Sequence, residues 1–222
     1  MFAGAYLLAS FPAHAGRPLS TEDAGVIDEA RCQVETWVDL PRVGAEAWFV
    51  PACNFGHGIE WQVGFARAKA NGEPSYFSAG YAQAKFLLPG SGEDAGWGGV
   101  VGVTKFSDLP SHRGWENPYA LIMGSTKLGD DFLHGAIGWS QERSSRRNAT
   151  TWGVAYEKPI TERVTLLGEA FSENLQKPYL RFGMRWELVE DSWAIDVSYV
   201  TRPGGTKDER LWSIGLFWQS AK

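Results

Sequence analysis

The fold is decided by the stretch Tyr179-Leu180-Arg181-Phe182-Gly183-Met184-Arg185-Trp186-Glu187-Leu188, whose side chains alternate strictly in character. One phase is polar or small, with two arginines and a glutamate, and the other is bulky and apolar. Strict alternation predicts a β-strand with one face in water and one in an apolar medium. Similar stretches recur along the chain, which is the pattern of a transmembrane barrel with an apolar exterior. We therefore predict an all-β fold, a transmembrane antiparallel up-and-down β-barrel of about 12 strands.

The expected strands are separated by two kinds of connection. They lie near residues 31–39, 45–53, 58–69, 75–88, 95–106, 115–127, 131–141, 149–158, 162–172, 178–189, 192–202 and 209–219. Short turns are expected at 54–57, 129–130, 158–161 and 190–191, and longer, more charged loops at 107–114, 142–148 and 202–208. Short periplasmic turns and longer outer loops are typical of outer-membrane barrels. An even number of strands places both termini at the periplasmic end.

The composition is typical of a protein surface in contact with a membrane, and it argues against a nucleic-acid partner. The 222 residues include 11 Trp, and no apolar run is long enough for a spanning helix. The formal net charge is −5, so a nucleic-acid partner is not expected. Aromatic side chains collect where lipid meets water. The predicted lipid-facing belts are Trp61, Tyr156, Trp186, Trp193 and Trp218 at the periplasmic ends of strands, and Trp139, Trp152, Tyr199 and Trp212 at the outer ends.

The amino-terminal region is expected to precede the barrel. Residues 1–15 have the apolar run and the small-x-small site, Ala13-His14-Ala15, of a secretory signal peptide cleaved after Ala15. The charged n-region is missing, and the alternative is that Met1 is a wrongly chosen start or a truncation. Residues 16–30 show no strand pattern and are a periplasmic tail, a short helix or a plug in the lumen. The barrel spans 31–222, and the predicted location is the outer membrane of a Gram-negative cell.

Two cysteines lie on neighbouring predicted strands. If Asp39 faces Glu46 across the turn after Pro41, the register brings Cys32 directly opposite Cys53. We therefore predict a cross-strand disulfide, with two buried free thiols as the alternative.

Several motifs resemble one family of bacterial outer-membrane proteins. They are residues 16–24, Cys32-Gln33-Val34-Glu35-Thr36-Trp37, residues 133–139, Trp152-Gly153-Val154-Ala155-Tyr156-Glu157, residues 168–171 and Asp196-Val197-Ser198-Tyr199. The family is described as putative MetA-pathway of phenol degradation, or as an outer-membrane transporter. The resemblance implies an outer-membrane barrel that passes hydrophobic or aromatic small molecules. Residues 213–218 resemble the carboxyl-terminal recognition strand of such proteins, which implies the barrel-assembly machinery as a partner.

The polar phase of the strands supplies the candidate lumen. Its pore- or solute-lining residues are Glu60, His134, Glu157, Glu169, Arg181, Arg185, Glu187 and Asp196. The two arginines are expected to face these carboxylates. Such a cluster either forms a charged constriction that orients a solute or braces the wall as paired buried charges. Glycines share this phase, Gly64, Gly102 and Gly153 among them, and their missing side chains leave volume inside.

The leading functional hypothesis is a channel or transporter-like barrel with a narrow charged lumen for small solutes. The alternatives are a structural or assembly barrel with a blocked lumen and an outer-membrane enzyme that modifies lipid. His134 and Ser140 lie six residues apart on one strand, too far to form a catalytic pair. An enzyme would therefore need a Ser or Thr beside His134 on a neighbouring strand. We expect no catalytic residue, cofactor or metal site. The expected partners are outer-membrane lipid, lipopolysaccharide near the basic loop 143–147, and a small-molecule solute.

Overall fold

The computed structural model describes residues 17–70, 72–92, 95–106, 115, 117–142, 147–174 and 176–221. The predicted signal peptide, the loop 107–114 and residues 143–146 of the basic loop lie outside these residues. The strands are β1 (Cys32–Pro41), β2 (Ala45–Asn54), β3 (Ile59–Lys69), β4 (Tyr76–Leu87), β5 (Ala95–Phe106), β6 (Asn117–Leu128), β7 (Asp131–Glu142), β8 (Arg147–Thr161), β9 (Val164–Glu173), β10 (Tyr179–Val189), β11 (Trp193–Thr201) and β12 (Leu211–Gln219). A short 3-10 helix, η1 (Lys207–Glu209), precedes β12.

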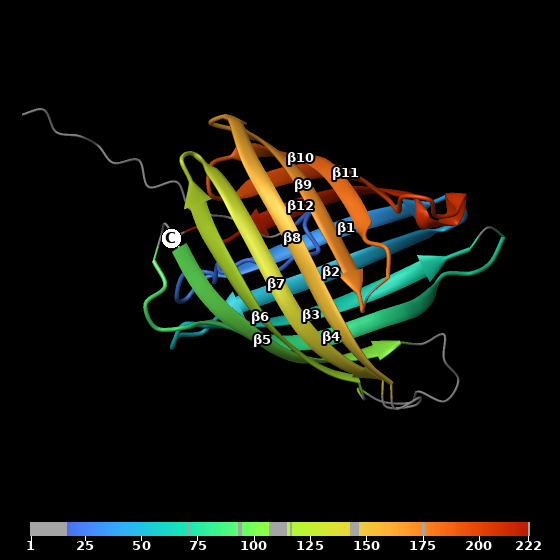
Figure 1. Ribbon diagram of the computed structural model, residues 1–222, viewed down its shortest axis with the longest axis horizontal. Helices are drawn as coiled ribbons and strands as arrows, with labels where there is room; N and C mark the ends of the chain where they lie inside the picture. The colour runs from blue at the N-terminus through green and yellow to red at the C-terminus, as the bar shows by residue number, and fades with distance from the viewer. Residues whose placement is uncertain are drawn as a thin grey trace, which may run out of the picture.

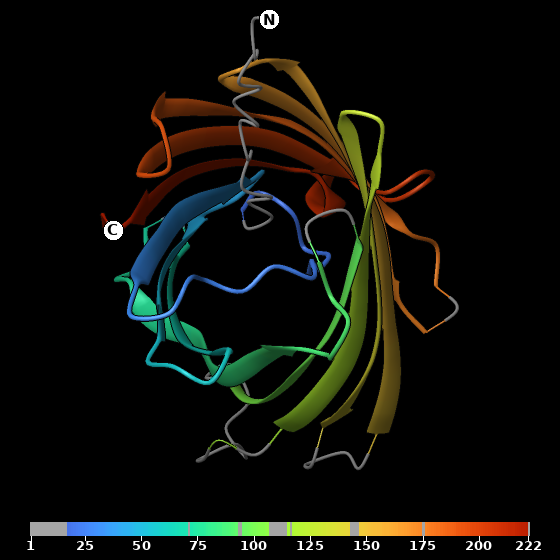
Figure 2. The same cartoon turned by 90° about the vertical axis from the view of Figure 1, so that its left-hand side faces the viewer.

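The strands form one closed barrel. Each strand pairs antiparallel with its neighbour in sequence, and β1 closes the ring on β12 (Figures 1 and 2). The predicted fold class is therefore confirmed. Closure matters in a bilayer because an open sheet edge would leave backbone groups without hydrogen-bond partners. Among the described residues, no helix has the length and apolar character needed to cross a membrane.

The short turns fix the register, and the largest error in the predicted boundaries lies at the end of β8. The turn at Gly129-Asp130 pairs Leu128 with Asp131 and sets the register of β6 against β7. The turn expected at 158–161 is wrong, because β8 continues to Thr161. A register irregularity between Pro159 and Thr161 lets the strand carry a proline that cannot donate to the ladder. The turn is therefore shifted to Glu162 and Arg163.

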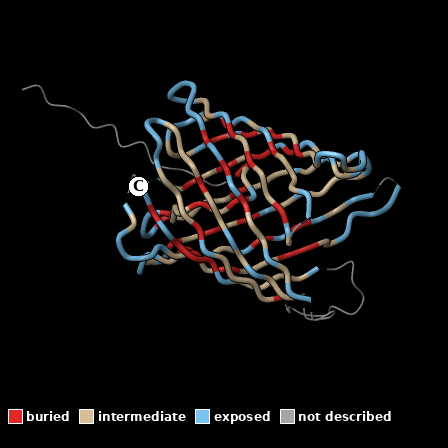
Figure 3. Tube along the Cα trace, viewed as in Figure 1, coloured by how far each residue is buried: buried red, intermediate tan, exposed pale blue. Residues whose placement is uncertain are grey.

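Buried and exposed residues alternate along the strands (Figure 3). On β10, Arg181 and Arg185 are buried, whereas Phe182 is 58% exposed. Polar side chains thus lie inside the barrel, and large apolar ones form its outer surface. This is the reverse of a water-soluble domain and the arrangement that lipid requires.

Most of the tryptophans lie on the outer surface, as predicted for the two aromatic belts. Trp97, near the periplasmic end of β5, is 62% exposed and joins that belt. Two tryptophans belong to the opposite face. Trp37 and Trp48 are register partners on β1 and β2 and share the inward phase with Glu35. They line the lumen, which the sequence analysis missed.

The disulfide between Cys32 and Cys53 is present, as predicted, and the two residues are direct register partners. It joins β1 and β2 at the periplasmic end, beside the point where the chain enters the first strand.

Residues 17–30, here called the lumen segment, lie inside the barrel. In the end view the segment crosses the ring of strands (Figure 2). Its last residue is held at the rim, where the amide of Ala30 donates to the carbonyl of Asn54 at 2.8 Å. The next residue, Arg31, donates to the carbonyl of Ser220 at 2.9 Å, near the seam between β1 and β12.

Candidate functional site in the barrel lumen

The first half of the lumen segment is held by the strands β9–β12, here called the anchoring wall. Glu169 on β9 accepts the amide of Ser20 at 2.8 Å and also that of Thr21. Arg181 on β10 is its register partner and forms an ion pair with it at 3.7 Å. Arg181 also donates to the carbonyl of Pro18. One charged pair of the wall therefore binds the segment backbone on both its donor and acceptor sides.

Arg17 connects the segment to the same wall by its side chain. Its guanidinium donates to Ser213 at 2.6 Å and forms an ion pair with Asp196 at 3.3 Å. Its carbonyl accepts a hydrogen bond from Arg185, the register partner of Asp196. Its amide donates to Glu35 on β1 at 3.2 Å. These buried charges are paired across elements, as charges removed from water must be.

A glycine lets the segment approach the wall closely. A Cβ built on Gly153 of β8 would overlap the hydroxyl group of Thr21. At two other inward glycines the space is filled by aromatic side chains, with Tyr81 against Gly64 and Tyr119 against Gly102. The expectation that glycines leave open volume is therefore wrong at these positions, because neighbouring groups occupy it.

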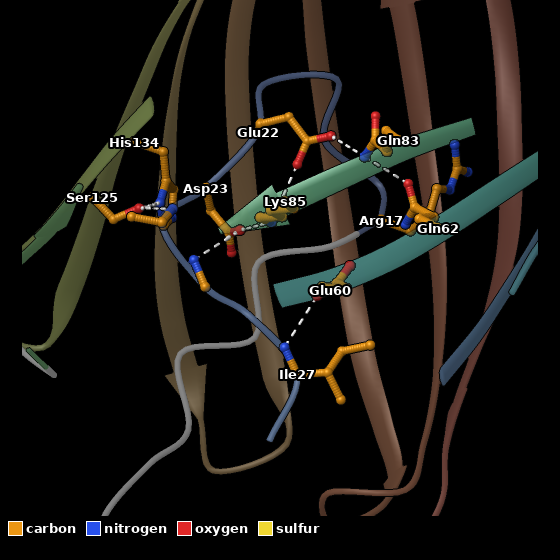
Figure 4. A network of polar contacts seen from close by, with 12 residues as sticks. Arg17, Glu22, Asp23, Ile27, Glu60, Gln62, Gln83, Lys85, Ser125 and His134 are labelled. Atoms are coloured by element: carbon orange, nitrogen blue, oxygen red, sulfur yellow. Dashed lines mark hydrogen bonds and ion pairs between the residues drawn. The ribbon is translucent and has the colours of Figure 1, made fainter. Parts of the chain in front are cut away.

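The second half of the segment is held by β3 and β4 (Figure 4). Lys85 on β4 forms ion pairs with Asp23 at 2.6 Å and with Glu22 at 3.2 Å. Glu60 on β3 accepts the amide of Ile27 at 3.0 Å. Lys85, Asp23 and Glu60 are all nearly excluded from solvent, so these contacts are shielded from water.

His134 has a serine neighbour after all. Ser125 on β6 is its register partner, with the hydroxyl 2.8 Å from the Nδ1 atom of His134. The same hydroxyl accepts the amide of Ala24 at 2.8 Å. The pair faces the lumen under the segment, with His134 only 2% exposed. A lipid on the outer face cannot reach it, and the pair serves here to bind the segment.

A cavity of about 410 Å³ remains between the segment and the strands β1–β4, here called the cavity wall. The wall lines it with Gln33, Glu35, Trp37, Asp39, Glu46, Trp48, Glu60, Gln62, Tyr81 and Lys85, and the segment adds residues 17 and 19–23. Of the anchoring wall only Arg181 takes part. The cavity therefore lies against β1–β4, and the segment separates it from most of β9–β12.

An aromatic surface crosses the cavity wall. The rings of Trp37 and Trp48 stack with centroids 5.4 Å apart, and Tyr81 lies 6.1 Å beyond Trp48. The indole of Trp37 donates to Asp39 and that of Trp48 to Glu46, each at 3.1 Å. Each tryptophan thus has a fixed orientation beside a carboxylate.

The predicted lining residues divide by position. Buried on the inward face are Glu60, His134, Glu157, Glu169, Arg181, Arg185 and Asp196, whereas Glu187 is half-buried towards the periplasmic end of β10. Glu60 and Arg181 line the cavity, and the others lie outside its lining. The sequence analysis missed Arg17, Asp39, Glu46 and the aromatic side chains. Among the described residues, no group of three or more His, Cys, Asp or Glu side chains is arranged to hold a metal ion.

The fold defines the class of protein, a closed twelve-stranded barrel of the outer-membrane type, and the predicted outer-membrane location is confirmed with it. The chain is similar to the KdgM porin, with a TM-score of 0.63 at 10% identity over 86% of this chain and 99% of that one. It is also similar to the NanC porin, with a TM-score of 0.59 at 11% identity over 84% and 98% of the two chains. The COG4313 outer membrane channel from Pseudomonas putida F1 gives 0.58 at 8% identity over 89% and 98%.

The chain belongs to the family described as Uncharacterised conserved protein UCP029691, whose model matches residues 4–215. The name of the phenol-degradation family that the sequence motifs resemble is not confirmed. No sequence among the curated proteins matches the chain.

Proposed function

We propose that the protein is an outer-membrane channel that passes small solutes through a narrow, charged lumen. The cavity of about 410 Å³ beside β1–β4 carries this proposal. A barrel with an apolar exterior and a polar interior conducts only where its interior is not filled, and this cavity is unfilled space inside the barrel. The lumen segment occupies the other side of the bore, so the passage is suited to small solutes.

The lining sets the polarity of the proposed solute. Charged and amide side chains surround the cavity, and Trp37, Trp48 and Tyr81 add apolar surface. Such a lining suits polar molecules with an aromatic or apolar part better than purely hydrophobic ones. The sequence resemblance implied that aromatic compounds pass through the barrel, and we keep their passage as part of this proposal.

A planar-bilayer recording tests the channel. The detergent-solubilised protein, with folding checked by heat-modifiable gel mobility, should give discrete and steady current steps in potassium chloride. A correctly folded barrel that inserts and remains silent would contradict the proposal.

The second candidate is a barrel whose lumen is blocked. The specific observation in its favour is the lumen segment, which is bound by buried charged groups of both walls, Glu169 and Lys85 among them. It predicts the silent barrel of the same experiment. A lipid-modifying enzyme would use the Ser125–His134 pair as its catalytic group. The pair lies in the lumen, where Ser125 accepts a hydrogen bond from the amide of Ala24, and this position argues against that role.

A further inference from the structure

The charges around the cavity are unbalanced. Its lining holds six carboxylates and three cationic side chains. The cations have carboxylate partners: Lys85 pairs with Asp23 and Arg181 with Glu169, and Arg17 pairs with Asp196. The excess in the cavity is therefore negative, and a lining of one sign concentrates solutes of the opposite sign.

Part of this excess lies at one place, near the outer ends of β1 and β2. Asp39 and Glu46 are direct register partners across these strands. Like charges directly opposite each other destabilise a strand pair. Neither carboxylate forms an ion pair with a described residue; their partners are the two indoles and, for Glu46, the hydroxyl of Ser78 at 2.7 Å. One oxygen of Asp39 is buried without a hydrogen-bond partner.

The aromatic surface beside these carboxylates already binds a cation of the chain itself. The guanidinium carbon of Arg17 lies 4.3 Å from the ring centroid of Trp37. Trp is the strongest aromatic partner for a cation. Trp48 and Tyr81 extend the surface from Trp37 along the cavity. The contact of Arg17 thus indicates what kind of group this surface accepts.

We propose that the cavity beside β1–β4 binds organic cations, small amines or guanidinium compounds with an aromatic or aliphatic body. Asp39 and Glu46 supply the counter-charge, and Trp48 and Tyr81 contact the body of the solute. The assignment rests on the proposed channel, because it names the class of solute that the channel passes.

The test uses three probes of nearly equal shape: phenethylamine, 2-phenylethanol and phenylacetate, which are cationic, neutral and anionic at neutral pH. Their binding to the folded protein in detergent is measured by calorimetry at low and high salt. We expect the amine to bind about tenfold more tightly than the carboxylate, since the amine gains a charge contact and a cation–π contact that the carboxylate cannot make. The preference should weaken in high salt.

The matched variants locate the site. Replacing the pair with Asp39→Asn and Glu46→Gln should remove the preference for the amine. The control, Asp130→Asn with Glu162→Gln, removes two exposed charges from periplasmic turns and should preserve it. Equal or tighter binding of the carboxylate by the unmodified protein overturns the proposal, as does equal loss in both double variants.

Current recorded on the same preparation separates this proposal from the channel. Conduction without preference for the amine overturns the cation site and leaves the channel. Preferential binding of the amine without conduction overturns the channel and leaves the site.

Discussion

The two walls of the barrel treat the lumen segment differently. The anchoring wall, β9–β12, binds the backbone of residues 17–21 through Glu169, Arg181 and Arg185. The cavity wall, β1–β4, leaves a cavity of about 410 Å³ beside the same residues and contacts the segment around it, through Glu35, Glu60 and Lys85 among others. Both walls carry buried charges. A charged face of the lumen therefore binds the segment where the segment presents groups that it can pair with, and it leaves a cavity where the segment does not.

The largest expected effect comes from releasing the segment from the anchoring wall. Replacing Arg181 and Arg185 by Ser removes the donors to two segment carbonyls. Hydrogen bonds from charged groups contribute roughly 1.5–3 kcal/mol each, so the segment should detach and the single-channel conductance should rise several-fold. Arg163→Ser, an exposed arginine in a periplasmic turn, is the control and should leave the conductance unchanged. Changed ion selectivity at constant conductance would mean instead that the arginines line the path without holding the segment.

A smaller effect on the binding of the segment is expected from adding a side chain at Gly153, where the segment packs against β8. In Gly153→Val the new side chain would occupy the position of Thr21. Overpacking costs about 1–3 kcal/mol, which should weaken the contact and speed hydrogen exchange at the amides of Ser20 and Thr21. The matched variant is Gly135→Val on β7, where a Cβ meets nothing closer than 4.0 Å. Equal exchange in the two variants would contradict the close packing of the segment on this wall.

The smallest effect on conduction is expected from the disulfide of the cavity wall. Reducing the bond between Cys32 and Cys53 should lower the unfolding temperature, since a disulfide contributes about 2–4 kcal/mol. The two residues are already register partners in β1 and β2, so the lining should keep its shape. Thermal unfolding and bilayer current, with and without reductant, give the two readouts. A marked change of current on reduction would show that the cavity wall depends on this bond.

The sequence predicts the parts of the fold that periodicity encodes. Alternation locates the strands and their inward faces, and the β1–β2 turn sets the register that joins Cys32 to Cys53. The same reasoning at the turn Gly129-Asp130 would have placed Ser125 opposite His134, a pairing that the sequence analysis missed. Trp37 also shares its phase with Glu35 and was detectable as a lumen residue. The sequence analysis assigned Trp37 to neither face of the barrel.

The lumen segment could not be placed in this way. It has no periodicity, and its polar groups are bound by side chains distant in sequence, as when Glu169 accepts the amide of Ser20. Periodicity reports which face a residue lies on, but not which of several acceptors a flexible stretch will reach. The position of the cavity depends on which acceptors bind the segment, so it could not be inferred from the sequence.

Cysteine accessibility in the bilayer shows whether solutes pass between the segment and β1–β4. Gln62→Cys places a thiol in the cavity wall, and Ala155→Cys places one on β8, where the side chain is 1% exposed. The native cysteines are joined to each other and do not react with the reagent. A charged, water-soluble methanethiosulfonate reagent should reduce the current of the Gln62→Cys variant and leave the Ala155→Cys variant unaffected. Block at Ala155→Cys with no effect at Gln62→Cys would contradict the account.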